Sequence, residues 1–418
     1  MKIAKVTGRE IYDARGLPAL ECEITLEDGS YVSGSVPSGI SKGSREAYEL
    51  RDGGQRLMGQ GVMKAVEVID SIIAPLLVGQ EPNLVSTDLS LIELDGTMEK
   101  AKLGANAMLA ASIATLRAQA SVENMETYEL VGYLCEFSSV TLPFAMFNMI
   151  SGGAHAPGNM RIQECLVIPV GAQSFRASME ASVTLYHHLG ELLKKKLPYV
   201  CTSIEGAYCG PFKDDAQALE LLMEAIEDVQ REKNYRFLIS LDVAASQFYD
   251  RKSGLYEWGN KQRDSQELIE LYQRLVKQYP IFSIEDGLSE FDEKNWRALV
   301  EVLGESVQII GDDLFASSSE QIAHGIEHGL ATGALIKPNQ VGTLTEALQA
   351  VKLCKEYDLA CVLSHRSAET NDTIIVDLAV GTSTGYIKIG APARGEHIAK
   401  YNELLRIEDA LMLSLLEQ

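Results

Sequence analysis

The most constraining feature of the sequence is a short apolar run that ends in charged residues. In residues 307–343, one such run ends at Asp312, an amphipathic segment follows, and a second run ends at Lys337. The runs are too short for buried helices and do not alternate with polar residues, which indicates strands covered on both faces. The pattern therefore predicts strand, helix and strand, as in a parallel sheet.

The same ending recurs along the chain. Apolar runs end at Asp242, Glu285, Asp312, Lys337, His365-Arg366-Ser367 and Lys388. By subtraction of positions, the last five ends are 27, 25, 28 and 23 residues apart, which leaves room for one helix in each interval. Strands of a (β/α) barrel present their C-terminal ends on one face, where catalytic residues collect. We therefore expect an α/β barrel with these charges around one mouth.

Three of these ends carry carboxylates in succession. Asp242, Glu285 and Asp312 would form an all-oxygen cluster, which suits Mg²⁺ or Mn²⁺. The alternative is that each acid pairs with a neighbouring Lys or Arg. Because three successive strand ends share this character, we favour the metal site.

The next strand end is basic. Lys337 would lie close to such a metal and to Lys388, and both charges disfavour a protonated amine, so we expect a lowered pKa for Lys337. A neutral lysine beside Mg²⁺ is suited to remove a proton α to a carboxylate. The alternative is a simple salt bridge between Lys337 and Asp312 or Asp313.

Composition and the remaining basic groups restrict the partners. A formal net charge of −22 argues against a duplex-wide nucleic-acid surface. Arg366 offers a guanidinium fork, and the neighbouring Ser367 a hydroxyl, and both suit the phosphate of a small molecule. His365 precedes them.

No run reaches the length of a membrane span, and the start of the chain does not resemble a signal peptide, so we expect a cytoplasmic protein. Seven cysteines without CxxC spacing indicate reduced thiols.

The N-terminal third has a different pattern. Residues 19–26 alternate, Asp28-Gly29 forms a turn, and residues 31–36 resume, which predicts a hairpin that joins residues 3–12 in a meander. Helical periodicity follows in residues 63–77 and 103–120. We expect an α+β domain over residues 1–135 and the barrel over residues 136–418.

Taken together, the segments resemble the enolase family along essentially the whole chain. They include VPSGISKGSREAYELRDG, KLGANAMLA, SGGAHA, SLDVAAS, SIEDGL, GDDLF, IKPNQVGTLTE, LSHRSAET and AKYNELLRIE, in the family's order and spacing. The resemblance implies an N-terminal α+β domain and an eight-stranded barrel whose first turn departs from plain βα alternation. It also implies the phosphopyruvate hydratase reaction of glycolysis, a carbon–oxygen lyase reaction that interconverts 2-phosphoglycerate and phosphoenolpyruvate with two Mg²⁺ ions.

Roles follow from the resemblance position by position. Asp242, Glu285 and Asp312 match the high-affinity metal ligands, and Ser41 matches a loop serine that helps bind the second ion. The loop over residues 38–43 is therefore expected to close on bound substrate. The resemblance also implies a homodimer or higher homo-oligomer, with Arg15 and Glu21 as candidate interface residues.

The catalytic and substrate positions are matched as well. Lys337 corresponds to the base and Glu205 to the acid, and Glu164 is the third catalytic residue. Glu164 shares the surroundings of the leaving hydroxyl with Gln163 and His155. The other substrate contacts are Arg366 and Ser367 at the phosphate, Lys388 at the carboxylate, and His365.

Some positions depart from the family pattern. Ile204 and Ala207 flank Glu205 where the family has an acidic residue and glycine, Ala368 replaces a glycine, and Ile389 replaces a threonine. An apolar residue at position 204 is expected to raise the pKa of Glu205 by desolvation. Two alternative functions remain open: a paralogue that acts on a related phosphorylated 2-hydroxy acid, and a non-catalytic binding protein on the same fold.

Overall fold

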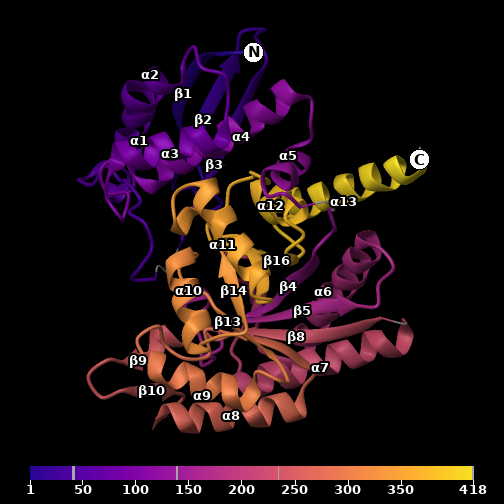
Figure 1. The fold of residues 1–418 in the computed structure, drawn as a ribbon. Coiled ribbons are helices and arrows are strands. Elements are labelled where there is room, and N and C mark those ends of the chain that lie inside the picture. Colours follow the sequence, from indigo (N-terminus) through magenta and orange to yellow (C-terminus); the bar gives the residue numbers. More distant parts are fainter. Residues whose placement is uncertain (40–42, 138–139, 234, 417–418) are drawn as a thin grey trace.

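The computed structural model of the protein describes residues 1–39, 43–137, 140–233 and 235–416 (Figure 1). The chain begins with a three-stranded antiparallel sheet in the order β1-β2-β3. Its strands are β1 (Ile3–Tyr12), β2 (Pro18–Leu26) and β3 (Tyr31–Val36). This arrangement confirms the expected meander. Gly29 lies in the turn between β2 and β3 with a φ of 86°, a conformation that glycine adopts without strain.

Helices complete the α+β unit. They are α1 (Met63–Val68), α2 (Ala74–Leu77), α3 (Leu84–Asp95), α4 (Ala105–Glu123) and α5 (Thr127–Leu134), preceded by the 3-10 helix η1 (Arg56–Gly59). Helices α1, α2 and α4 contact the sheet, and α3 and α5 contact α4. Helix α4 contacts both β2 and β3. A Cβ atom at Gly34 of β3 would lie 2.6 Å from the side chain of Ile113 on α4. The close approach of sheet and helix therefore requires glycine at this position.

The helical pattern of residues 63–77 is present but interrupted. A π-helical turn, η2 (Ile69–Ile73), separates α1 from α2. Pro75 lies in the first turn of α2 and has no N–H to donate. The π turn therefore comes directly before the turn that contains the proline. The second expected helix, over residues 103–120, is α4.

Eight strands form a closed barrel, as expected. In chain order they are β4 (Phe144–Ser151), β5 (Glu164–Val170), β8 (Arg236–Asp242), β12 (Ile281–Glu285), β13 (Gln308–Gly311), β14 (Gly333–Ile336), β15 (Ala360–Ser364) and β16 (Gly385–Gly390). Pairing of β16 with β4 closes the ring. All neighbours are parallel except β5, which is antiparallel to both β4 and β8. The barrel thus departs from plain βα alternation at its first turn.

The remaining elements cover the barrel. Its helices are α6 (Phe175–Lys196), α7 (Asp215–Glu232), α8 (Ser265–Gln278), α9 (Glu293–Leu303), α10 (Ser319–His328), α11 (Leu344–Glu356), α12 (Ile374–Gly381) and α13 (Gly395–Leu416). Short 3-10 helices are η3 (Gly153–His155), η4 (Ala245–Phe248) and η5 (Pro338–Gln340). The strands β6 (Cys201–Thr202) and β7 (Tyr208–Cys209) extend the barrel sheet beside β4, and β9 (Tyr249–Asp250), β10 (Leu255–Trp258) and β11 (Lys261–Arg263) form a separate small sheet.

Alternate residues of the barrel strands belong to two different cores. Leu335 packs in a small cluster with strand residues such as Ile310 and Val362, whereas its neighbours Ala334 and Ile336 pack in the large cluster that includes the helices. Both faces of these strands are therefore buried. This explains why their sequences show no alternation of polar and apolar residues.

The N-terminal unit lies against the loops that follow β14 and β15 (Figure 1). Arg117 of α4 forms an ion pair with Asp372 at 2.7 Å, and Lys100 pairs with Glu346 of α11 at 2.8 Å. These contacts bring the N-terminal unit to the C-terminal end of the barrel strands. The division after residue 135 stays a prediction. In the described part of the chain, no helix combines the length and apolar character needed to cross a membrane.

Candidate active site

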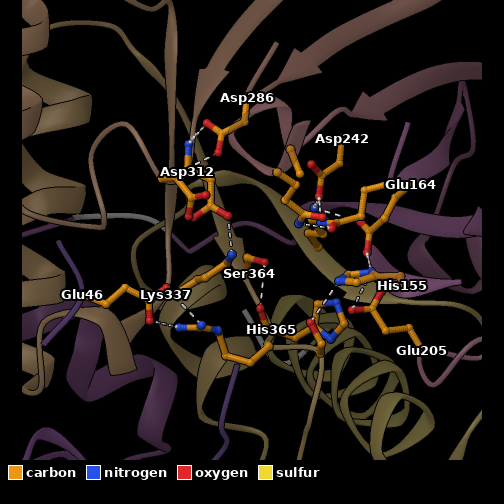
Figure 2. Close-up of a pocket in the computed structure, with 17 residues that line it drawn as sticks. Glu46, His155, Glu164, Glu205, Asp242, Asp286, Asp312, Lys337, Ser364 and His365 are labelled. Atoms are coloured by element: carbon orange, nitrogen blue, oxygen red, sulfur yellow. Dashed lines mark hydrogen bonds and ion pairs between the residues drawn. The ribbon is translucent and has the colours of Figure 1, made fainter. Parts of the chain in front are cut away.

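One cavity at the C-terminal ends of the barrel strands collects nearly all the residues singled out from the sequence (Figure 2). Its volume is about 30 Å³. The predicted residues that line it are Glu164, Glu205, Lys337, His155, Gln163, His365, Arg366, Ser367, Lys388, Asp242 and Asp312. Glu285 lies just beneath, in contact with Lys388. Ser41 and the centre of its loop lie outside the described residues.

Three carboxylates on neighbouring strands surround the ammonium group of Lys388. Strand pairing aligns Glu164 with Asp242 and Asp242 with Glu285. The Nζ atom of Lys388 lies 2.9 Å from Glu164, 2.8 Å from Asp242 and 2.8 Å from Glu285. Burial lowers the pKa of Lys388, but the three negative charges outweigh it and hold the pKa well above its usual value. Burial and the charge of Asp242 raise the pKa of Glu285.

Lys337 forms an ion pair with Asp312 across the mouth of the barrel. Gln340 donates a further hydrogen bond to Asp312 at 3.1 Å. Burial lowers the pKa of Lys337, and the charge of Asp312 raises it more, so the net shift is upward. The prediction of a lowered pKa is wrong for this arrangement, because the nearest charge to Lys337 is negative. The salt bridge that the sequence left as an alternative is present.

Two further acids, Asp286 and Asp313, line this part of the site and were not predicted as metal ligands from the sequence. Asp286 accepts hydrogen bonds from the backbone N–H groups of Asp312 at 2.8 Å and of Asp313 at 2.9 Å. The backbone of Asp286 is left-handed, with a φ of 44°, which turns its side chain back toward the next strand end. The signal available in the sequence was the doubling of acids at Glu285-Asp286 and Asp312-Asp313.

The opposite side of the cavity holds a second acidic group. His155 Nδ1 lies 3.2 Å from Glu164 and 3.5 Å from Glu205, and Asn148 donates to Glu205 at 3.1 Å. Burial raises the pKa of Glu205, but the charge of His155 and the hydrogen bond with Glu164 lower it more. The expectation of a raised pKa from the apolar Ile204 is therefore wrong, since His155 determines the sign.

His365, Arg366 and Ser367 directly follow β15 and form the remaining wall. Both terminal nitrogens of Arg366 contact the carboxylate of Glu46, at 2.8 and 3.1 Å. Ser367 Oγ lies 3.3 Å from His155 Nε2. Burial and the charge of His397 hold the pKa of His365 well below its usual value, so this imidazole is neutral. Glu46 was not identified from the sequence, because it reaches the site from the N-terminal unit.

Comparison with known families agrees with this geometry over nearly the whole chain. Residues 139–414 match the family described as "Enolase, C-terminal TIM barrel domain". Residues 3–131 match "Enolase, N-terminal domain". The chain belongs to the enolase family. Enolases are lyases, and their family depends on Mg²⁺ and binds small phosphorylated substrates.

The acids of this enolase fit such a metal. Asp286, Asp312 and Asp313 each offer a carboxylate oxygen, and these oxygens lie within 4.8 Å of one another. Burial and the charge of Asp312 raise the pKa of Asp313 to about 7, which reflects crowded negative charge. An all-oxygen set of this kind suits a hard divalent cation. The predicted ligand set, which joins Asp312 to Asp242 and Glu285, stays a prediction.

Proposed function

We propose that the protein catalyses the reversible, Mg²⁺-dependent dehydration of 2-phosphoglycerate to phosphoenolpyruvate. One observation carries the proposal. In this enolase-family chain, one cavity is lined by Lys337, the buried Glu205, and Arg366 with Ser367. These are the groups needed to remove a proton, assist a leaving hydroxyl and hold a phosphate. The protein would act in glycolysis and gluconeogenesis.

The metal ions would be held by Asp242, Glu285 and Asp312, with Ser41 at the second ion. When bound, Mg²⁺ would supply positive charge that stabilises the enolate form of the substrate carboxylate. Asp312, whose charge raises the pKa of Lys337 in this structure, would be engaged as a ligand instead. Lys337 would then take the proton from C2.

The remaining residues would bind and orient the substrate. Glu205, with Glu164, Gln163 and His155 around it, would assist departure of the hydroxyl from C3. Lys388 would face the substrate carboxylate, and the neutral His365 would line the site without adding charge. Each of these side chains comes from a strand end or a short loop fixed on the barrel, which supports a defined geometry.

Arg366 and Ser367 would hold the phosphate. In the structure the guanidinium fork of Arg366 is engaged by the Glu46 carboxylate, and a phosphate presents oxygens of similar spacing with more negative charge. Substrate would therefore compete with Glu46 for Arg366. This exchange links substrate binding to the N-terminal unit, which carries Glu46.

The departures from the family pattern do not alter the lining of the cavity. Ala207, Ala368 and Ile389 are fully buried and, like the half-buried Ile204, are absent from the cavity wall. Their side chains act through packing. The wall itself therefore supports the phosphoglycerate reaction, and gives no specific reason to prefer a related phosphorylated 2-hydroxy acid or a non-catalytic role.

Turnover of 2-phosphoglycerate tests the proposal, followed by the absorbance of phosphoenolpyruvate with and without Mg²⁺. We expect turnover that requires Mg²⁺ and is lost in Lys337→Ala. Turnover of another phosphorylated 2-hydroxy acid but not of 2-phosphoglycerate would indicate the paralogue. Binding of 2-phosphoglycerate without any turnover would indicate the non-catalytic protein.

A further inference from the structure

Two cysteines face each other at the base of the loop that carries Glu205. The short strands β6 and β7 are antiparallel and align Cys201 directly with Cys209. The two Sγ atoms lie 2.8 Å apart, and the Cys201 thiol also donates to the Cys209 carbonyl oxygen at 3.2 Å. Residues opposite each other in an antiparallel pair have Cα atoms about 4.5–5.5 Å apart, within the range that disulfides span.

We propose that Cys201 and Cys209 are a modification site, a dithiol that small disulfides oxidise reversibly to an intramolecular disulfide, with Cys201 attacking first and Cys209 completing the bond. Exposure sets this order. Cys201 is exposed, whereas the other six cysteines of the chain are buried. Only Cys201 can therefore meet a dissolved oxidant directly.

The chemistry is two successive thiol–disulfide exchanges. The Cys201 thiolate attacks one sulfur of a disulfide such as oxidised glutathione, which breaks that bond, releases one glutathione thiolate and leaves a mixed disulfide on Cys201. The Cys209 sulfur then attacks the Cys201 sulfur, gives up its proton to solvent and expels the second glutathione. The protein loses two electrons and two protons, and one oxidised glutathione becomes two reduced molecules.

The surroundings of Cys209 agree with the proposal that Cys201 reacts first. Burial and the hydrogen bond with Cys201 raise the pKa of Cys209 to about 12, so Cys209 is protonated at neutral pH and a poor nucleophile toward dissolved reagents. Once Cys201 carries glutathione, however, its sulfur lies within a short movement of Cys209. Attack within the fixed β6–β7 pair has a high effective concentration, which offsets the small thiolate fraction.

The bond would join the two ends of an active-site loop. Backbone hydrogen bonds already hold this loop, from Gly206 N–H to Ser203 at 3.0 Å and from Ala391 N–H to Glu205 at 3.2 Å. A disulfide between Cys201 and Cys209 adds a covalent closure at its base. The inference concerns the thiols alone and does not depend on the proposed reaction.

Incubation of the native protein with oxidised glutathione, followed by intact mass and peptide mapping, tests the proposal. The wild type should lose the mass of two hydrogens, carry no glutathione and yield a peptide that links Cys201 to Cys209. Thiols titrated after denaturation should fall from seven to five. Dithiothreitol should restore all of them. Cys354 and Cys361, a second contacting pair that is fully buried, serve as the internal control and should stay reduced.

Single variants separate the two roles. Cys209→Ser should accumulate one glutathione on Cys201, because nothing displaces it, and Cys201→Ser should remain unmodified. Circular dichroism establishes that each variant is folded, and the wild-type peptide map decides the question if one is not. A wild type that retains glutathione on Cys201, or that keeps seven titratable thiols, would overturn the proposal.

Discussion

Lys337 and Glu205 reach the cavity from different elements, Lys337 directly after β14 and Glu205 between β6 and β7. In the proposed reaction Lys337 removes the C2 proton, so Lys337→Ala should lose exchange of that proton with solvent deuterium. Glu205→Gln leaves the base in place. It should retain the exchange while forming phosphoenolpyruvate at least about a hundredfold more slowly. Proton NMR of 2-phosphoglycerate in D₂O measures the exchange, and absorbance measures the product.

A lysine outside the cavity provides the control for this pair of variants. Lys352 is exposed on α11, and Lys352→Ala should retain both exchange and turnover. Mg²⁺ and substrate binding are measured for each variant. The division of roles is wrong if Glu205→Gln binds both ligands yet loses C2 exchange as completely as Lys337→Ala.

At this scale the sequence predicts which residues meet, but not which charges pair. The charged strand ends follow from the pattern of apolar runs, and the structure brings them to one cavity. The pKa shifts of Lys337 and Glu205 could not be predicted, because they depend on Asp312 and His155, and no sequence pattern gives the distances to those partners. Asp286 was missed for a related reason, since its left-handed backbone decides where its side chain points.

At the scale of elements, three neighbouring strand ends are proposed to share one metal. Asp312→Ala removes a ligand from the cavity wall and not a side chain of the apolar core, so the fold should persist while Mg²⁺ affinity falls by at least about tenfold. Isothermal titration calorimetry measures the affinity. Glu301→Ala, on the exposed face of α9, is the matched control and should bind Mg²⁺ as the wild type does. Unchanged affinity in Asp312→Ala would exclude this ligand set.

The contact of β3 with α4 gives a prediction about stability. Gly34→Ala would place a methyl group against Ile113 and the backbone of Ala114, and overpacking of this kind costs about 1–3 kcal/mol. A lowered thermal midpoint should follow. At Gly395, by contrast, a Cβ would meet nothing within 4 Å, so Gly395→Ala should not lower the midpoint. Equal midpoints for the two variants would show that the sheet and α4 can move apart freely.

The order of strands and helices was predictable because most barrel strands share one pattern, an apolar run that ends in a charged residue. The reversed strand β5 and the π turn η2 do not follow from that pattern. The residues between β4 and β5 contain a short 3-10 helix but no α-helix, and β5 returns antiparallel to β4. From the residues alone, apolar runs and turn residues do not give strand direction. The resemblance to enolases supplied that feature. Hydrophobic periodicity likewise does not predict the π turn before Pro75.

At the scale of the whole molecule, the N-terminal sheet has an outer surface that could pair with a second copy. Tyr12 and Tyr31 of β1 and β3 are 58% and 70% exposed. Glu21 on β2 forms an ion pair with Arg9 across the sheet, and Arg15 is held by Asp13 at 2.7 Å. The homodimer stays a prediction, with Arg15 and Glu21 as its candidate interface residues.

Light scattering at micromolar concentration tests the dimer. The wild type should have twice the 45.7 kDa mass of one chain. Glu21→Lys places a second positive charge beside Arg9, so like charges would meet at the proposed interface and the mass should fall toward that of a monomer. Glu301→Lys makes the same change on α9 of the barrel, far along the chain from the N-terminal sheet, and should leave the dimer intact. A monomeric wild type would reject the dimer, and a dimer that survives Glu21→Lys would place its interface elsewhere.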